Sequence, residues 1–379
     1  MIGKPSLLAI VAASLAACGS QSRVGAEPND VARTAQRPDG ALTMRVARAA
    51  HSAVGLPDGR VLLIGGCVRA SCEAGPDSGT VDLFDARTGR FELGGALLEP
   101  RVSTTTALLP NGKVLIAGGW VGSMVTQTTE LFDSTVGRSG AGPDLSSPRA
   151  DMAVVTLGDG RVVLAGGFDG RRALDSIDLF DPADNSLRRL GTLTTPRTAA
   201  GAALLPDGRV LVVGGGTNGS AGLHAEASAE IIDPASGASR HTGSLAHARY
   251  KHAVVRLPNG RILVIGGSDE RDSRGKLDAI ESFDPATGRF TVAGRTRAKR
   301  YKIVNAVVVL GDGRVLIAGG ASRSEIFDPA TGGVSSFGPS FGGSLNFATA
   351  TAVPGRGVLV AGGYYEDGIR MSRQAWLLR

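Results

Sequence analysis

Seven copies of a short apolar run that ends in two glycines constrain the fold of this 379-residue chain more than any other feature. The glycine doublets are Gly65-Gly66, Gly118-Gly119, Gly166-Gly167, Gly214-Gly215, Gly266-Gly267, Gly319-Gly320 and Gly362-Gly363. Successive doublets lie 53, 48, 48, 52, 53 and 43 residues apart. Because a regular period of this length is typical of repeat architectures, the sequence predicts one array of repeats, not several unrelated domains.

Each repeat is expected to contribute four β-strands. An apolar run leads to an Asp-Gly or Asn-Gly turn such as Asp58-Gly59, which favours a tight hairpin. The run before each doublet shows no polar alternation, so both faces of this second strand should be buried. A third strand ends in a motif such as Leu83-Phe84-Asp85, and a more polar fourth strand follows, for example at residues 90–93. The expected fold class is therefore all-β.

These motifs resemble Kelch repeats, in particular the propeller domains of the galactose-oxidase type. The resemblance rests on the doublets, on Phe-Asp-Pro turns such as Phe180-Asp181-Pro182, and on Leu-Pro-Asp-Gly-Arg-Val-Leu at residues 56–62. It implies a seven-bladed Kelch-type β-propeller over residues 38–379. The last repeat stops before a fourth strand. Met44 occupies the position of the apolar residue that stands before the leading arginine of other repeats. We therefore expect an N-terminal strand at residues 38–45 to close the ring.

The N-terminus has the pattern of an export signal. Lys4 precedes the apolar residues 7–16, and Leu15-Ala16-Ala17-Cys18 resembles a bacterial lipobox. We expect a lipoprotein signal peptide at residues 1–17, lipidation of Cys18, a flexible tether at residues 18–37 and an outer-membrane anchor that uses the lipid alone. An ordinary secretory signal is the alternative.

Composition narrows the other partners. The formal charge is +6, but no basic run with interleaved aromatic residues points to nucleic acid. We therefore expect no nucleic-acid partner. Cys67 and Cys72 follow the first doublet, and export into an oxidising compartment favours a disulfide between them. This pair does not supply the four ligands of a closed zinc site, and we expect no metal and no cofactor.

A basic residue stands seventeen positions before six of the seven doublets. These residues are Arg48, Arg101, Arg149, Arg197, Arg249 and Lys302, and Leu345 takes the place in the seventh repeat. Third-strand acids match them: Asp82, Glu130, Asp178, Glu230, Glu281 and Glu325, with neutral Gln374 in the seventh. Because the repeat without the base also lacks the acid, we favour structural ion pairs over a ring that binds carboxylates or sulfates.

Residues that differ between repeats are the better candidates for a ligand-binding face, because a scaffold repeats and a site does not. The candidates are His51, Trp120, Phe168, Tyr250, Lys251, His252, Tyr301 and Tyr364. Together they offer aromatic surfaces and hydrogen-bonding groups suited to a sugar. The alternative is a solvated rim on which the two histidines only pack.

The functional prediction is a module that binds an envelope protein or glycan without catalysis. The alternative is a carbohydrate-active enzyme, resembling either a Kelch-type sialic-acid mutarotase or epimerase or a degenerate galactose oxidase; a purely structural envelope protein is a third reading. Galactose-oxidase-like enzymes use copper held by tyrosines and histidines, with a cysteine-modified tyrosine. Four Tyr and five His give no such constellation that can be placed from the sequence.

Overall fold

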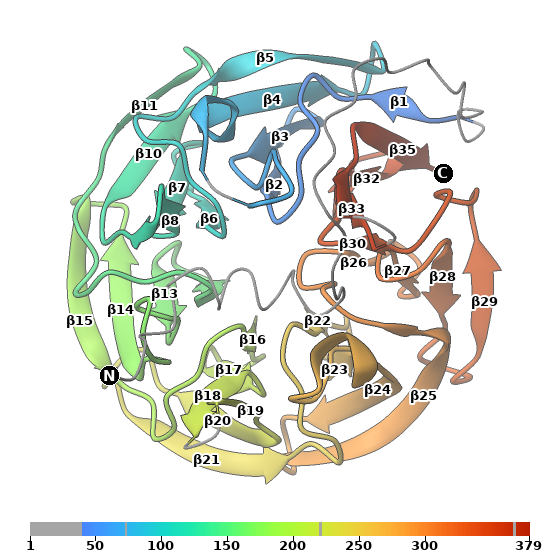
Figure 1. Ribbon diagram of the computed structural model, residues 1–379. Helices are drawn as coiled ribbons and strands as arrows, with labels where there is room; N and C mark the ends of the chain where they lie inside the picture. Colours follow the sequence, from blue (N-terminus) through green and yellow to red (C-terminus); the bar gives the residue numbers. More distant parts are fainter. Residues whose placement is uncertain (1–39, 73, 220–221, 367–368) are drawn as a thin grey trace, which may run out of the picture.

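The computed structural model describes residues 40–72, 74–219, 222–366 and 369–379. Its sheets follow one another in chain order around a ring, as Figure 1 shows. Apart from the short 3-10 helices η1 (Pro76–Gly79) and η2 (Asp272–Arg274), the regular structure of these residues is all β. The expected signal peptide, tether and Cys18 lie outside the described residues. No helix in the described ranges is long and apolar enough to span a membrane.

The first two repeats share one eight-stranded sheet. Its strand order is β2 (Ser52–Gly55), β3 (Arg60–Ile64), β4 (Thr80–Asp85), β5 (Arg90–Ala96), β11 (Arg138–Ala141), β10 (Thr129–Asp133), β7 (Val114–Ala117) and β6 (Thr105–Leu108). Each half is an antiparallel set of four strands that corresponds to one repeat. A single parallel pairing, Ala96 with Arg138, joins the two halves at their outer strands.

The next four repeats each form a four-stranded antiparallel sheet. The third repeat forms β12 (Ala153–Thr156), β13 (Val162–Ala165), β14 (Ser176–Asp181) and β15 (Ser186–Thr192), and the fourth forms β16 (Gly201–Leu204), β17 (Val210–Val213), β20 (Ser228–Ile232) and β21 (Ser239–Ser244). The fifth repeat forms β22 (Ala253–Arg256), β23 (Ile262–Ile265), β24 (Leu277–Asp284) and β25 (Arg289–Arg300). The sixth forms β26 (Val307–Val309), β27 (Val315–Ile317), β28 (Ser324–Phe327) and β29 (Val334–Phe337). The last strand of each sheet lies on the outside of the ring (Figure 1).

Small sheets are built from the segments around the doublets. They are β8 (Trp120–Val121) with β9 (Met124–Val125), β18 (Gly216–Gly219) with β19 (Gly222–Ala225), and β30 (Leu345–Asn346) with β33 (Tyr364–Tyr365) and β34 (Arg370–Met371). These sheets and the loops beside them surround the candidate site described below.

The last sheet joins the two ends of the described chain. Its order is β1 (Leu42–Thr43), β35 (Gln374–Leu378), β32 (Gly357–Ala361) and β31 (Thr349–Val353). Leu42 pairs with Ala375, and the Met44 amide donates a 2.7 Å hydrogen bond to the Arg373 carbonyl. The strand β1 lies inside the segment that the sequence suggested for this role. It covers an edge of β35 that would otherwise be open.

Neighbouring sheets pack face to face. The second strand of each repeat is almost fully buried, as in β7 and β13, because its two faces contact two neighbours. One apolar cluster, for example, combines Val54 and Leu62 of the first repeat with Ile116 and Phe132 of the second. Another combines Met44 and residues of the first repeat with Leu359 and Ala361 of the last. Packing therefore continues across the junction of the chain ends.

The glycine doublets are required where one repeat meets the next. Gly65 and Gly66 have φ angles of +67° and +94°, a region that favours glycine. A Cβ on Gly65 would stand 2.7 Å from the Arg101 carbonyl oxygen, and one on Gly66 would stand 2.7 Å from the Ala49 oxygen. The Gly66 amide donates a 2.9 Å hydrogen bond to that Arg101 carbonyl. The doublet thus allows two backbones to approach each other closely.

The N-terminal segment should contribute measurably to stability. Replacing the fully buried Met44 with Ala should lower the free energy of unfolding by about 2–5 kcal/mol, because it leaves a cavity between the first and last repeats. Chemical denaturation measures this. Met124, which is 72% exposed, is the control, and its change to Ala should cost about 0.5 kcal/mol or less. Equal midpoints for the two variants would contradict the docking of this segment.

Candidate functional site

Buried ion pairs lie in the first five repeats. The structure brings Arg48 to Asp82 (3.4 Å), Arg101 to Glu130 (2.9 Å), Arg149 to Asp178, Arg197 to Glu230 (2.7 Å) and Arg249 to Glu281. Each of these arginines also donates to the carbonyl of the first glycine in its own repeat's doublet. Because these arginines are buried and paired inside the protein, they do not form an exposed anion-binding ring.

Lys302 does not pair with Glu325, which corrects the sixth ion pair suggested by spacing. Arg300 takes that place: it lies 3.1 Å from Glu325 and donates to the Gly319 carbonyl. The sixth repeat has two additional residues between the base and the doublet, so counting seventeen positions back reached Lys302 instead. Because of this shift, Lys302 lies at a different position in the fold from the five arginines.

Lys302 belongs to an inner circle that we call the axial ring. Its seven members, one from each repeat, are Ala50, Ser103, Asp151, Ala199, Lys251, Lys302 and Phe347. All have φ angles between 49° and 58°, although none is glycine. Backbone hydrogen bonds link several neighbours, for example Ala199 to Asp151 and Phe347 to Lys302. Such strained conformations persist where the surroundings impose them, and they cluster at functional sites.

Residues of the axial ring line two hollows. All seven members line an inner cavity of about 310 Å³, which also contacts His51, His252 and Asn305. Six of them, all except Lys302, also line an outer cavity of about 400 Å³. Tyr250, Asp272 and Tyr364 contribute to the wall of the outer cavity. A sugar-sized ligand would therefore meet the side chains of the axial ring from either cavity.

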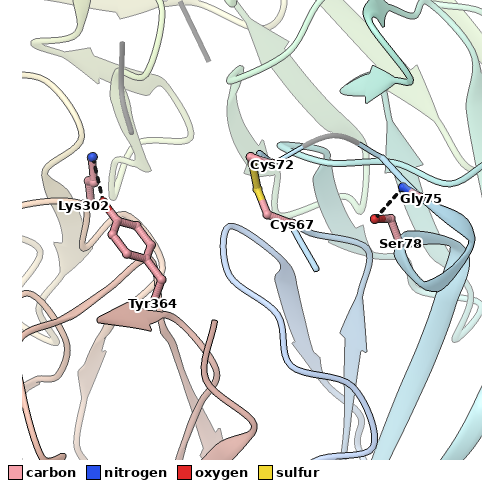
Figure 2. The surroundings of a disulfide bond; sticks show 6 residues. All are labelled: Cys67, Cys72, Gly75, Ser78, Lys302 and Tyr364. Carbon is pink, nitrogen blue, oxygen red and sulfur yellow. Dashed lines mark hydrogen bonds between the residues drawn. A yellow bond between two sulfur atoms is a disulfide. The ribbon is translucent and has the colours of Figure 1, made fainter. Parts of the chain in front are cut away.

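Two lysines and three tyrosines form a contact network beside the axial ring. Lys302 Nζ donates to the Tyr364 hydroxyl at 2.9 Å, and Figure 2 shows this contact. Lys251 Nζ donates to the Tyr301 hydroxyl at 3.4 Å, and this hydroxyl lies 3.3 Å from that of Tyr250. Each ammonium group also lies over three aromatic rings, 4.9–5.8 Å from their centroids. Cation–π attraction helps to hold both charges in this apolar setting.

Burial shifts the pKa values of the charged groups. It lowers the pKa of Lys302 to about 7, and the positive charge of Lys251 acts in the same direction, while Asp272 and Glu366 oppose it. Burial also lowers the pKa of Lys251, against the attraction of Asp272 and Asp151. It raises the pKa of Asp151, although Lys251 partly opposes that shift. Titratable groups whose pKa values are shifted by burial are thus placed around one cavity.

Asp151 and Lys302 lie on opposite sides of the axis. They are three positions apart in the axial ring of seven, and both line the inner cavity. The Asp151 side chain is exposed to this hollow, yet the surrounding protein raises its pKa. Only 4% of Lys302 is exposed. The inner cavity therefore has Asp151 on one side and Lys302 on the other, and the Lys302 ammonium group is held by the Tyr364 hydroxyl.

The remaining candidates lie at three places around the cavities. His51 and His252 are buried at the starts of β-strands and pack against the doublets of neighbouring repeats, and burial lowers the pKa of each to about 3. They line the inner cavity as neutral groups. Trp120 and Phe168 line the outer cavity with their ring centroids 6.4 Å apart. Tyr301 is buried behind Tyr250 in an edge-on contact.

Several site residues escaped the sequence reasoning. Ser103, Asp151 and Phe347 stand two positions after the arginine of their repeat or the residue that aligns with it. Comparison of that second position across repeats would have shown its variability. The positive φ angle that turns these residues inward leaves no mark in the sequence, because non-glycine residues occupy every position.

The structure also contains a disulfide between Cys67 and Cys72 (Figure 2). Neither cysteine is therefore available to modify a tyrosine. In the described part of the chain, no three His, Cys, Asp or Glu side chains come together as a metal-ligand set. These residues do not fit a copper centre of the galactose-oxidase type, and we derive no step through copper.

Comparison with known proteins identifies a shared fold. No family model and no curated protein matches the chain. Among solved structures, a fungal alcohol oxidase of the AA5 family, in complex with copper, superposes with a TM-score of 0.70 at 17% identity. The match covers 90% of this chain and 76% of the oxidase. The all-β fold is thus similar to that of an AA5, galactose-oxidase-like structure, consistent with a β-propeller.

This comparison contradicts the prediction of a binding module without catalysis. This solved structure is that of an enzyme, which agrees better with the alternative of a galactose-oxidase-like enzyme. The prediction went wrong because it equated catalysis with a copper site or with a sequence motif. The groups with shifted pKa values meet only after folding. At this level of identity the likeness establishes the fold, so the reaction must be argued from the cavity itself.

Removing one arginine should show the value of the buried pairs. Arg197→Met leaves the buried Glu230 without its cation and should lower the free energy of unfolding by about 3–5 kcal/mol. Arg209→Met breaks a partly exposed pair with Asp207 and should cost about 0–1 kcal/mol. Urea denaturation compares the two variants. A similar small loss in both would show that the inner pairs do not support the fold.

Proposed function

We propose that this chain is a carbohydrate-active enzyme that isomerises acidic sugars in the axial cavities. The observation that carries the proposal is the placement of Asp151 opposite Lys302, both with pKa values shifted towards neutrality. Interconversion of sugar anomers requires one group that accepts a proton and one that donates it. A single pocket with both groups suits this reaction class.

The lysines select the charge of the substrate. Lys251 lines both cavities, and Lys302 lies beside it in the axial ring. A sugar carboxylate that binds Lys251 would gain a charge-assisted hydrogen bond in a poorly solvated site. The aromatic rings of Tyr250, Phe347 and Tyr364 offer flat apolar surfaces next to these cations. We therefore assign substrate binding to Lys251 and to these rings.

The proton steps then follow from the geometry. The Asp151 carboxylate accepts the proton of the anomeric hydroxyl while the Lys302 ammonium donates a proton to the ring oxygen. The bond between the anomeric carbon and the ring oxygen breaks, and an open-chain carbonyl compound forms. Rotation about the next carbon–carbon bond and the reverse proton transfers close the other anomer. Each group regains its starting protonation state, so no further reactant is needed.

Burial adjusts both groups to these roles. Because the pKa of Asp151 is raised, its carboxylate is a stronger base than an ordinary aspartate. Because the pKa of Lys302 is lowered to about 7, its ammonium is a stronger acid than an ordinary lysine. The burial-raised pKa values of Tyr250, Tyr301 and Tyr364 keep their hydroxyls protonated, so they act as hydrogen-bonding groups.

The same proposal includes the finer details of architecture and address. We infer seven blades of the Kelch type, closed by β1, from the seven doublets and from apolar packing between the first and last repeats. We also infer export and lipid anchoring at Cys18 from the lipobox pattern. An acidic glycan of the cell envelope would then be a source of substrate.

Activity should fall as the pH rises through about 7. The proposed acid must be protonated, and the pKa of Lys302 is about 7, so kcat/KM for anomer interconversion should decrease above that pH. Exchange NMR of glucuronic acid and of N-acetylneuraminic acid measures the rate at each pH. A rate that stays constant or increases from pH 6 to pH 8.5 would overturn this assignment.

Matched variants separate binding from proton transfer. Lys302→Arg keeps the positive charge but donates a proton poorly, so kcat should fall about 10²- to 10⁴-fold with KM nearly unchanged. Lys251→Met should mainly raise KM. Lys113→Met, at an outer turn, is the control and should leave both constants unchanged. If Lys302→Arg and Lys251→Met both lower kcat and raise KM to a similar extent, the changes indicate a general structural defect instead.

Lipidation is tested separately. Cells that express the full chain should incorporate labelled palmitate into the protein, and Cys18→Ser should abolish the label because the thiol is the acceptor. Membrane fractionation should show release of the variant from the membrane. Cys67→Ser with Cys72→Ser is the control, and it should remain labelled. Equal labelling of wild type and Cys18→Ser contradicts the proposed anchor.

A further inference from the structure

The outer cavity has two chemically different walls. Lys251, Tyr250, Tyr364 and Asp272 form its charged and polar side. The disulfide of Cys67 and Cys72, with Trp120, Phe168, Leu223 and Met371, forms an apolar side. Figure 2 shows the disulfide and the Lys302–Tyr364 pair on different parts of the chain, with Tyr364 on β33. Nothing in the proposed proton transfer uses the apolar side.

Packing across several repeats builds this apolar wall. Cys67, Cys72, Trp120 and Phe168 belong to one buried cluster, and Met371 packs against it. The residues come from the first, second, third and last repeats. Residues from four repeats hold one another in place, so the wall is a preformed part of the fold. Preformed apolar surface binds a ligand without a cost for ordering side chains.

The Trp120 ring forms part of this wall. Only 5% of the residue is exposed, yet its indole Nε1–H has no hydrogen-bond partner among the described residues. A buried donor without a partner is unfavourable in a folded protein. The ring lines the cavity and contacts Phe168 at a centroid distance of 6.4 Å. Because the Nε1 atom itself is buried, the indole presents apolar ring surface to a ligand in the cavity.

We propose that the apolar wall binds an aryl or acyl substituent of the anionic substrate, while Lys251 binds its carboxylate. The inference rests on the proposed function and narrows its substrate class to acidic sugars that carry such a substituent and keep a free anomeric hydroxyl. The cavity volume of about 400 Å³ accommodates a substituted sugar ring. Charge on one wall and apolar surface on the other fix the orientation of the ligand.

A pair of simple carboxylates tests the wall without any sugar chemistry. The probes are 3-phenylpropionate and propionate, and calorimetry or ligand-detected NMR with the full chain gives their Kd values. Burial of a phenyl group should make 3-phenylpropionate bind about 10- to 100-fold more tightly than propionate. Equal Kd values for the two probes would overturn the proposal.

Variants connect that ratio to the wall. Trp120→Ala and Met371→Ala should each reduce the ratio of the two Kd values, whereas Trp120→Phe should preserve most of it. Met124→Ala, in the same hairpin as Trp120 but 72% exposed, is the control and should not change the ratio. Lys251→Met should weaken both probes and leave the ratio intact. A ratio that Trp120→Ala and Met371→Ala leave unchanged would show that the phenyl group binds elsewhere.

The result is separable from the test of the proposed function. Loss of anomer interconversion with a retained Kd ratio would remove the isomerase proposal and keep a site for amphiphilic carboxylates. Anomer interconversion together with equal Kd values for the two probes would keep the isomerase proposal and remove the role of the wall.

Discussion

One backbone hydrogen bond at each junction between repeats holds this structure together. The second glycine of each doublet donates to a carbonyl of the next repeat, from Gly66 to Arg101 through to Gly363 and Arg48. The same arginine binds a buried carboxylate and the carbonyl of its own doublet, as Arg197 does with Glu230 and Gly214. A side chain at either glycine would separate the two backbones. Each repeat is therefore locked to its successor, and the last is locked to the first.

The same junction creates the site. The residue two positions after each arginine or its equivalent is forced into a positive φ angle and faces the central hollow. The scaffold thus presents seven inward positions whose side chains are free to vary. Asp151, Lys251 and Lys302 occupy three of them and meet at the cavity. The strained positions repeat exactly as the scaffold does, but the residues on them do not.

The chain shares a fold with a copper alcohol oxidase, but its cavity has a different chemical character. The two cysteines beside the cavity form a disulfide, and the described residues supply no metal-ligand set. Buried lysines, a carboxyl group and tyrosines, with pKa values shifted by burial, lie around the cavity instead. An apolar wall stands next to these groups. The architecture is therefore a support on which several kinds of chemistry are possible.

The sequence by itself determined the repeat, the all-β class and five of the six buried charge pairs, because each depends on local motifs at regular spacing. Counting failed at Lys302, where two additional residues shift the register and Arg300 takes the structural place. The site was decided by tertiary structure. Asp151 and Lys302 are 151 positions apart in the sequence, and only closure of the ring places them around one cavity. Their pKa shifts arise from burial, and burial exists only in the folded chain.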